Sequence, residues 1–150
     1  MPQSLANIIV HLVFSTKNRT PVIMAPFSDD LHEYCGGILR MAGCNPIRIG
    51  SADDHMHLLF ALSRTHTVAA TVEQLKTSSC KWLKERLCGD NTFRWQNGYG
   101  VFSIQASNVQ RVVRYIENQR LHHRQQSFQE EYRKILQTNG LHFDENYVWD

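Results

Sequence analysis

Residues 53–60 read Asp-Asp-His-Met-His-Leu-Leu-Phe, and this stretch predicts a β-strand with two chemically different faces. Side chains alternate along a strand, so His55 and His57 share one face while Met56 and Leu58 share the other. A buried apolar row on the second face would fix the register, because a slip by one residue would bury both histidines. The two imidazoles therefore converge on one point, where they can share a metal ion. The alternative is a pair of half-exposed histidines on the surface of a sheet.

A second group of chemically active side chains comes later in the chain. Apolar residues recur at helical spacing between Val109 and Ile116, which predicts a helix with Tyr115 and Gln119 one turn apart on an adjoining face. A phenol can act as a nucleophile, and an amide oxygen is a hard, neutral metal ligand. Taken alone, the same two residues are a half-buried aromatic and an ordinary polar residue of a helix.

Patterning along the chain predicts three further strands and three further helices. We expect the strands at residues 6–15, 46–50 and 99–106, and the helices at about residues 28–42, 67–89 and 127–140. Ser127 and Glu130 form a capping box for the last helix. The order βαββαβ followed by C-terminal helices predicts an α+β, ferredoxin-like fold with an antiparallel four-stranded sheet. We expect two helices on one face, and a central histidine strand whose other face is free for the site and lies near the Tyr115 helix.

Length and composition limit the class of protein. With 150 residues, 42% of them hydrophobic, the chain is expected to form a single domain over residues 1–150. A formal charge of +2 is too small by itself to indicate nucleic-acid binding. The sequence has no P-loop glycine signature, so no nucleotide cofactor is expected. The apolar run at residues 5–14 is too short to span a bilayer and lacks the features of a signal peptide, so we expect a cytoplasmic protein without a membrane partner.

The order and spacing of the two motifs resemble those of the single-tyrosine HUH transposases of bacterial insertion sequences, the superfamily of REP-associated tyrosine transposases. The resemblance is carried by residues 54–59, which hold the histidine pair, and by the run Tyr-Ile-Glu-Asn-Gln at residues 115–119. Residues 11–19, 95–103 and 147–149 resemble further family stretches in the same order. The resemblance implies a ferredoxin-like fold whose catalytic tyrosine lies on a helix after the sheet.

The resemblance also implies the roles of the site residues. Tyr115 would be the nucleophile, and His55, His57 and Gln119 would bind Mg²⁺ or Mn²⁺. The implied reaction is cleavage and rejoining of single-stranded DNA at hairpin-bearing ends of a mobile element, through a 5′-phosphotyrosine and a free 3′-hydroxyl. A tyrosine hydroxyl has an unperturbed pKa of about 10, so the metal must supply most of the activation. With three neutral ligands the ion would keep its full charge.

The resemblance implies a homodimer as well, in which the tyrosine helix of one subunit often completes the histidine site of the other. Nothing in the sequence decides between assembly within one subunit and assembly between two.

Several residues are candidate contacts for the DNA. They are Arg111, Arg114, Arg120 and Arg124 around the tyrosine helix, Lys17 and Arg19 in the turn after the first strand, and Trp95 in a polar loop. Cations of this kind suit phosphates, and an indole can stack on an unpaired base. The alternative is a solvated surface for the cations and a core position for the tryptophan.

Three alternatives to an insertion-sequence transposase stay open. A domesticated relative would act on chromosomal repeat hairpins, and only the flanking DNA would distinguish it. A metal-dependent hydrolase would use His55 and His57 to activate water and would form no covalent adduct. Against it, the sequence shows neither a third histidine nor a carboxylate near the pair. An inactive single-strand binding module is disfavoured by the intact tyrosine, histidines and glutamine.

Overall fold

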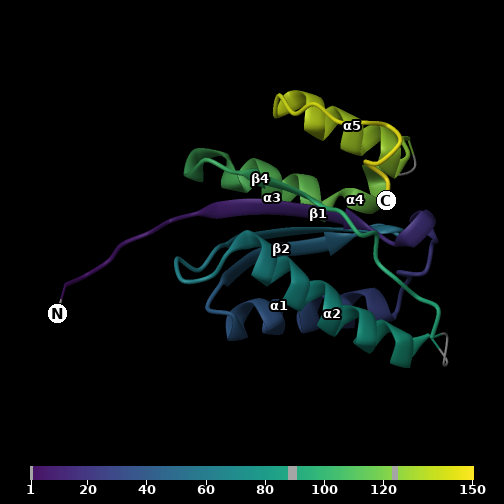
Figure 1. Ribbon diagram of the computed structural model, residues 1–150, viewed down its shortest axis with the longest axis horizontal. Helices are drawn as coiled ribbons and strands as arrows, with labels where there is room; N and C mark the ends of the chain where they lie inside the picture. Colours follow the sequence, from purple (N-terminus) through teal and green to yellow (C-terminus); the bar gives the residue numbers. More distant parts are fainter. Residues whose placement is uncertain (1, 88–90, 123–124) are drawn as a thin grey trace.

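The computed structural model describes residues 2–87, 91–122 and 125–150, and within them the elements follow the predicted order (Figure 1). The strands are β1 (Ile9–Ser15), β2 (Asn45–Ser51), β3 (His55–Ala61) and β4 (Gly100–Ser103). The helices are α1 (Phe27–Met41), α2 (Val68–Arg86), α3 (Val109–Glu117), α4 (Gln119–His122) and α5 (Phe128–Thr138). Short 3-10 turns lie at Lys17–Arg19 and Ala106–Asn108.

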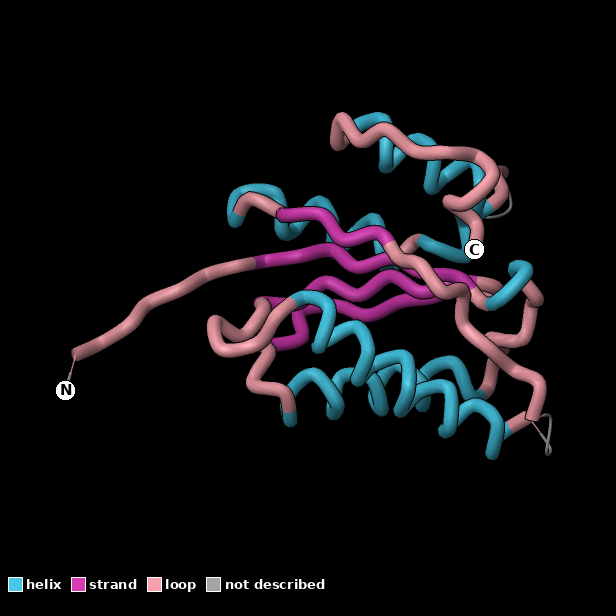
Figure 2. The backbone as a smooth tube through the Cα atoms, in the orientation of Figure 1, coloured by secondary structure: helices cyan, strands magenta, loops and turns pink. Residues whose placement is uncertain are grey.

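The four strands form one antiparallel sheet in the order β2-β3-β1-β4. This order confirms the ferredoxin-like fold and the central position of the histidine strand. Two helices, α1 and α2, cover one face of the sheet, while α3, α4 and α5 lie on the opposite side (Figures 1 and 2). The predicted position of the Tyr115 helix near this second face is confirmed, but the face is not open, because α5 also lies over it after the chain returns across the sheet.

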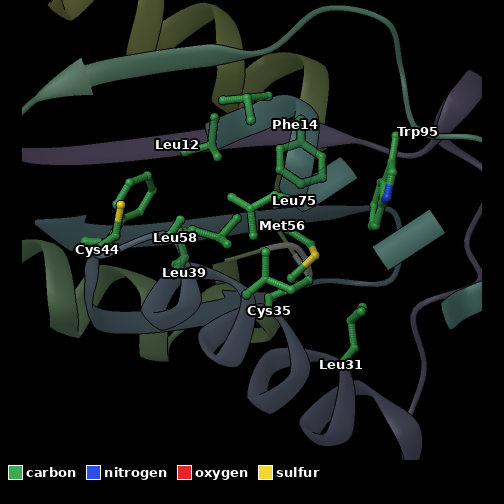
Figure 3. Close-up of a cluster of buried hydrophobic side chains, with 14 of the residues drawn as sticks. Leu12, Phe14, Leu31, Cys35, Leu39, Cys44, Met56, Leu58, Leu75 and Trp95 are labelled. Atoms are coloured by element: carbon green, nitrogen blue, oxygen red, sulfur yellow. The ribbon is translucent and has the colours of Figure 1, made fainter. Parts of the chain in front are cut away.

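The main apolar core lies between the sheet and the α1–α2 layer. Met56, Leu58 and Phe60 on β3 are at most 1% exposed and belong to this core. Figure 3 shows Met56 and Leu58 among side chains from β1, α1 and α2. Burial of each such side chain contributes about 1.5–3 kcal/mol. The apolar row that fixes the register of β3 is confirmed.

The helix starts that the sequence predicts from N-capping residues are confirmed, whereas the predicted end of the second helix at Gly89 lies outside the described residues. Thr67 accepts a hydrogen bond from the backbone N–H of Ala70 at the start of α2, and Ser127 accepts one from Glu130 at the start of α5. None of the described helices is both long and apolar enough to cross a membrane.

Two strands are shorter than predicted. β1 begins at Ile9 rather than at residue 6, because residues 2–8 are exposed and extend past the end of the sheet. β4 ends at Ser103 rather than at residue 106, because a 3-10 turn follows at Ala106–Asn108 and leads into α3.

Two glycines let the second helical layer approach the sheet closely. A Cβ atom on Gly50 would lie 2.6 Å from Cγ2 of Ile116 on α3. A Cβ atom on Gly100 would lie 2.6 Å from the hydroxyl of Tyr132 on α5. Because glycine has no side chain, both helices pack directly on strand backbone at these positions.

Candidate active site

The histidine pair lies at the centre of the sheet, on the face that α3 and α5 cover. His55 and His57 are both 0% exposed, and their rings meet edge to face with centroids 5.1 Å apart. The convergence of the two imidazoles is confirmed. The alternative of half-exposed surface histidines is wrong, because the C-terminal helices bury the pair.

Tyr115 and Gln119 approach the histidines from the helical layer above. Ile116, which is 1% exposed, packs on Gly50 and fixes α3 against the sheet. The ring of Tyr115 then lies edge to face with His57, with centroids 5.7 Å apart. The amide oxygen of Gln119 lies 3.2 Å from Nε2 of His55. The predicted neighbourhood of tyrosine, glutamine and histidines is confirmed.

The sequence predicted that Tyr115 and Gln119 lie on one continuous helix, but the structure divides them between two. α3 ends at Glu117, Asn118 is its C-cap, and Gln119 begins the short α4. Tyr115 and Gln119 nevertheless stay one helical turn apart, because the Gln119 amide donates a hydrogen bond to the backbone carbonyl of Tyr115 at 3.4 Å.

A carboxylate that the sequence analysis missed completes the cluster. Glu131 on α5 is 1% exposed, and its Oε1 lies 3.1 Å from Nε2 of both His55 and His57. Its second oxygen accepts a hydrogen bond from the hydroxyl of Tyr115. The signal was present in the helical spacing: Glu131 falls on the stripe formed by Phe128, Tyr132, Ile135 and Leu136, where a carboxylate is out of place.

The donors present fit a divalent metal ion. One nitrogen from each of His55 and His57 and a carboxylate oxygen of Glu131 all lie within 4.8 Å of one another. Two imidazole nitrogens with nearby carboxylate and amide oxygens suit ions of the Mn²⁺ and Zn²⁺ type, and the oxygens suit Mg²⁺. The expectation of a site without a carboxylate is therefore wrong.

Each histidine is also held from its other side. The carboxylate of Asp54 lies 2.7 Å from Nδ1 of His55, and Nε2 of His11 lies 2.8 Å from Nδ1 of His57. Such contacts fix the orientation of a metal-binding ring and the position of its proton. With Nδ1 occupied in this way, both rings direct Nε2 toward Glu131.

Burial and the two carboxylates set the protonation of the site. Burial alone would lower the pKa of His55, but hydrogen bonds and charge from Asp54 and Glu131 outweigh it and raise the pKa to about 9. Burial, and then the charge of Glu131, raise the pKa of Tyr115 well above its ordinary value. The phenol is therefore protonated at neutral pH and needs a proton acceptor or a cation to become a nucleophile.

The chain matches one known protein family over most of its length. Residues 4–119 match the family described as "Transposase IS200 like". The chain belongs to the IS200-like transposase family. No curated protein matches the chain.

Two solved structures share the fold of this IS200-like transposase. One is a candidate transposase from Deinococcus radiodurans R1, with 22% identity and a TM-score of 0.63 over 80% of this chain and 96% of the other. The second is a REP-associated tyrosine transposase bound to a REP hairpin, with 14% identity and a TM-score of 0.60 over 82% of this chain and 72% of the other. At these identities the two structures confirm the fold alone.

The family match includes both histidines, Tyr115 and Gln119, but it ends before α5. Glu131 therefore enters the site of this transposase from a helix beyond the matched residues. The motifs of the matched family therefore do not predict a carboxylate at Glu131.

Several residues that were predicted to contact DNA contact other side chains of this chain instead. Lys17 pairs with the carboxylate of Asp150, and the guanidinium of Arg19 lies 5.9 Å from the ring centroid of Trp149. Arg120 pairs with Asp53, although half of its side chain stays exposed.

The remaining predicted contacts divide into three groups. Arg111 and Arg114 lie exposed on α3, as a DNA contact requires. Arg124 lies outside the described residues. The prediction that Trp95 stacks on bases is wrong: it is 5% exposed, packs edge to face on Phe14, and donates its indole N–H to Ser79 at 3.0 Å. The polar loop folds back on β1, which places this ring in the core.

Proposed function

We propose that this IS200-like transposase cleaves and rejoins single-stranded DNA through a covalent bond to Tyr115, with a divalent metal ion held by His55 and His57. Family membership carries the transposase activity. The observation that supports the chemistry is the meeting of a tyrosine hydroxyl, two histidine Nε2 atoms and a carboxylate in one buried cluster.

The metal would bind Nε2 of His55 and His57, with oxygen ligands from Gln119, Glu131 or both. Mg²⁺ and Mn²⁺ are the proposed ions. When bound, the ion supplies positive charge that polarises the scissile phosphate and stabilises its transition state. Because Glu131 adds negative charge beside the histidines, the net charge felt by the phosphate is smaller than three neutral ligands would leave.

The chain's own residues carry the proton and the covalent bond. The Tyr115 oxygen attacks phosphorus, a phosphorus–oxygen bond to tyrosine forms, and the bond to the 3′ oxygen of the preceding nucleotide breaks. The phenol proton passes to Glu131, which already accepts the hydrogen bond from this hydroxyl. The departing oxygen is protonated from the carboxylic acid or from water. Attack by a later 3′-hydroxyl on the phosphotyrosine reverses these changes and joins strands without ATP.

The proposed substrate is single-stranded DNA with hairpins at the ends of a mobile element. A structural relative is bound to a REP hairpin, which supports a hairpin substrate here. Arg111 and Arg114 on the outer side of α3 suit contacts with DNA phosphates beside the nucleophile. Tyr115 lies against His57 of its own chain, which supports assembly of the site within one subunit. A homodimer stays a prediction.

Glu131 also supports a competing function, that of a metal-dependent hydrolase. A carboxylate next to two metal-binding histidines can act as a general base for water, which is the group that the hydrolase alternative lacked in the sequence. The position of the Tyr115 hydroxyl on the same carboxylate favours tyrosine as the nucleophile. A covalent adduct separates the two functions.

The test is incubation of the protein with labelled single-stranded oligonucleotides from the flanks of its gene and from chromosomal repeat hairpins, with Mg²⁺ or Mn²⁺. We expect a labelled protein adduct that maps to Tyr115 by peptide mass analysis, disappears with chelator and is absent in Tyr115→Phe. Cleavage without an adduct would establish the hydrolase, and binding without cleavage would establish the inactive module. The oligonucleotide set that is cleaved separates a mobile-element enzyme from a domesticated one.

A further inference from the structure

One buried titratable residue beside the site has no role in the proposed reaction. His11 lies on β1, in the central pair of strands, and is 6% exposed. Its Nε2 lies 2.8 Å from Nδ1 of His57, and the two rings stack with centroids 5.0 Å apart. Phe102 on β4 packs against the edge of the same ring. His11 also lines a cavity of about 310 Å³ together with Tyr115 and Glu131.

The hydrogen bond between the two histidines has a direction that depends on which nitrogens carry protons. For His57 to bind a metal ion through Nε2, that nitrogen must be unprotonated, and a neutral ring then carries its proton on Nδ1. Nδ1 must in turn donate to an acceptor. The unprotonated Nε2 of a neutral His11 is the acceptor in place.

The two metal ligands have partners of different chemistry: an imidazole beside His57 and a carboxylate beside His55. A neutral imidazole supports His57 without adding charge, whereas the carboxylate of Asp54 supports His55 with a negative charge. The two metal ligands therefore have partners of different electrostatic character.

We propose that His11 is a positioning residue: it accepts the Nδ1 proton of His57 and so keeps the Nε2 lone pair of His57 available to the metal ion. The inference rests on the proposed function, because it assigns His57 as a metal ligand. The role differs from core packing, which Val13 performs on the same face of β1. Val13 lies directly opposite His57 in the β1–β3 register and is 0% exposed, yet its side chain has no acceptor.

The experiment compares His11→Leu, His11→Gln and the control Val13→Ala. Leucine removes the acceptor, while the amide of glutamine restores one close to the position of Nε2. Mn²⁺ affinity is measured by electron paramagnetic resonance on the full chain without DNA. Nitrogen chemical shifts of the Zn²⁺-loaded wild-type protein report which nitrogen of His57 carries the proton.

We expect His11→Leu to bind Mn²⁺ about 10- to 100-fold more weakly than wild type, as is usual when a partner of a metal-binding histidine is lost. His11→Gln should recover most of this loss, and Val13→Ala should bind as wild type does. In the wild-type spectrum, His57 should be protonated on Nδ1 and unprotonated on Nε2.

Equal Mn²⁺ affinity in His11→Leu and Val13→Ala would overturn the inference, as would equal weakness in His11→Leu and His11→Gln. If neither His11 variant folds, a His57 proton on Nε2 in the Zn²⁺-loaded wild type would overturn it alone. Loss of Mn²⁺ binding in wild type itself would instead refute the metal site of the proposed function, and the inference with it.

Discussion

The two faces of β3 are buried equally, but one is apolar throughout and the other carries two histidines beside Leu59. Met56 and Leu58 face α1 and α2 and are 0% exposed within an apolar core. His55 and His57 face α3 and α5, are also 0% exposed, and meet Glu131. Burial of apolar groups stabilises a fold, whereas burial of charged and polar groups costs free energy unless they are paired. One face of the strand therefore maintains the fold, and the other maintains a site at some expense to stability.

The largest expected effect comes from Tyr115→Phe on the polar face. This change removes the nucleophilic oxygen and leaves the ring, so adduct formation and cleavage should fall by at least about a thousandfold. DNA binding should stay near the wild-type value, because the phenylalanine ring can still pack against His57. Denaturing gels measure the adduct and fluorescence anisotropy measures binding. Loss of binding together with cleavage would mean that the phenol is structural.

Leu58→Ala tests the apolar face one residue away from the histidine. The cavity it leaves should reduce the free energy of unfolding by about 2–5 kcal/mol, measured by urea denaturation. Cleavage per folded molecule should be unchanged, since the side chain points away from the site. A variant that folds stably but cannot cleave would show that the two faces are not separable.

Gly50→Ala tests whether α3 must pack directly against the backbone of the sheet. The new methyl group would overlap Cγ2 of Ile116 and lie 2.9 Å from its backbone oxygen, so α3 must move. We expect the free energy of unfolding to fall by about 1–3 kcal/mol. Because Tyr115 moves with α3, the rate of cleavage should fall about a hundredfold. Gly37→Ala in α1 is the matched control, because its Cβ meets nothing within 4 Å. Equal behaviour of the two variants would argue against the close contact.

The dependence on pH needs no substitution, and it has opposite signs with and without metal. The folded pKa of His55, about 9, is above its ordinary value of 6.5, so protonation stabilises the metal-free fold fully below pH 6.5 and this contribution is lost as pH rises through 9. A metal ion must displace this proton, so its affinity should rise about tenfold per pH unit up to about pH 9. Thermal unfolding with Mg²⁺ or with chelator, at both ends of this window, measures the two trends. A parallel pH trend in both samples would contradict the assignment of His55 as a ligand.

The sequence was sufficient for the parts of the molecule that depend on local pattern. The fold followed from the alternation in β3 and from the N-caps Thr67 and Ser127. Four residues of the candidate site followed from that alternation and from the spacing of Tyr115 and Gln119. The sequence was insufficient where distant segments meet. Glu131 reaches the histidines only because α5 folds back over the sheet, and Trp95 is buried only because its loop returns to β1.

Polar residues inside apolar patterns were the clues that the sequence analysis did not use. His11 interrupts the apolar run of β1, and Glu131 interrupts the apolar stripe of α5. Glu131 lies in the site, and His11 lies beside it. A buried polar residue at an otherwise apolar position therefore marks a candidate site residue, and Glu131 is one that lies beyond the family match.

Mn²⁺ binding, measured by electron paramagnetic resonance, shows whether the polar face of β3 holds a metal ion. Met56→Leu is the matched control for His57→Ala, because it changes the neighbouring residue on the apolar face with little change in volume. We expect one bound Mn²⁺ per chain in wild type and in Met56→Leu, and loss of that binding in His57→Ala. Absence of binding in wild type, or unchanged binding in His57→Ala, would mean that this face is not a metal site.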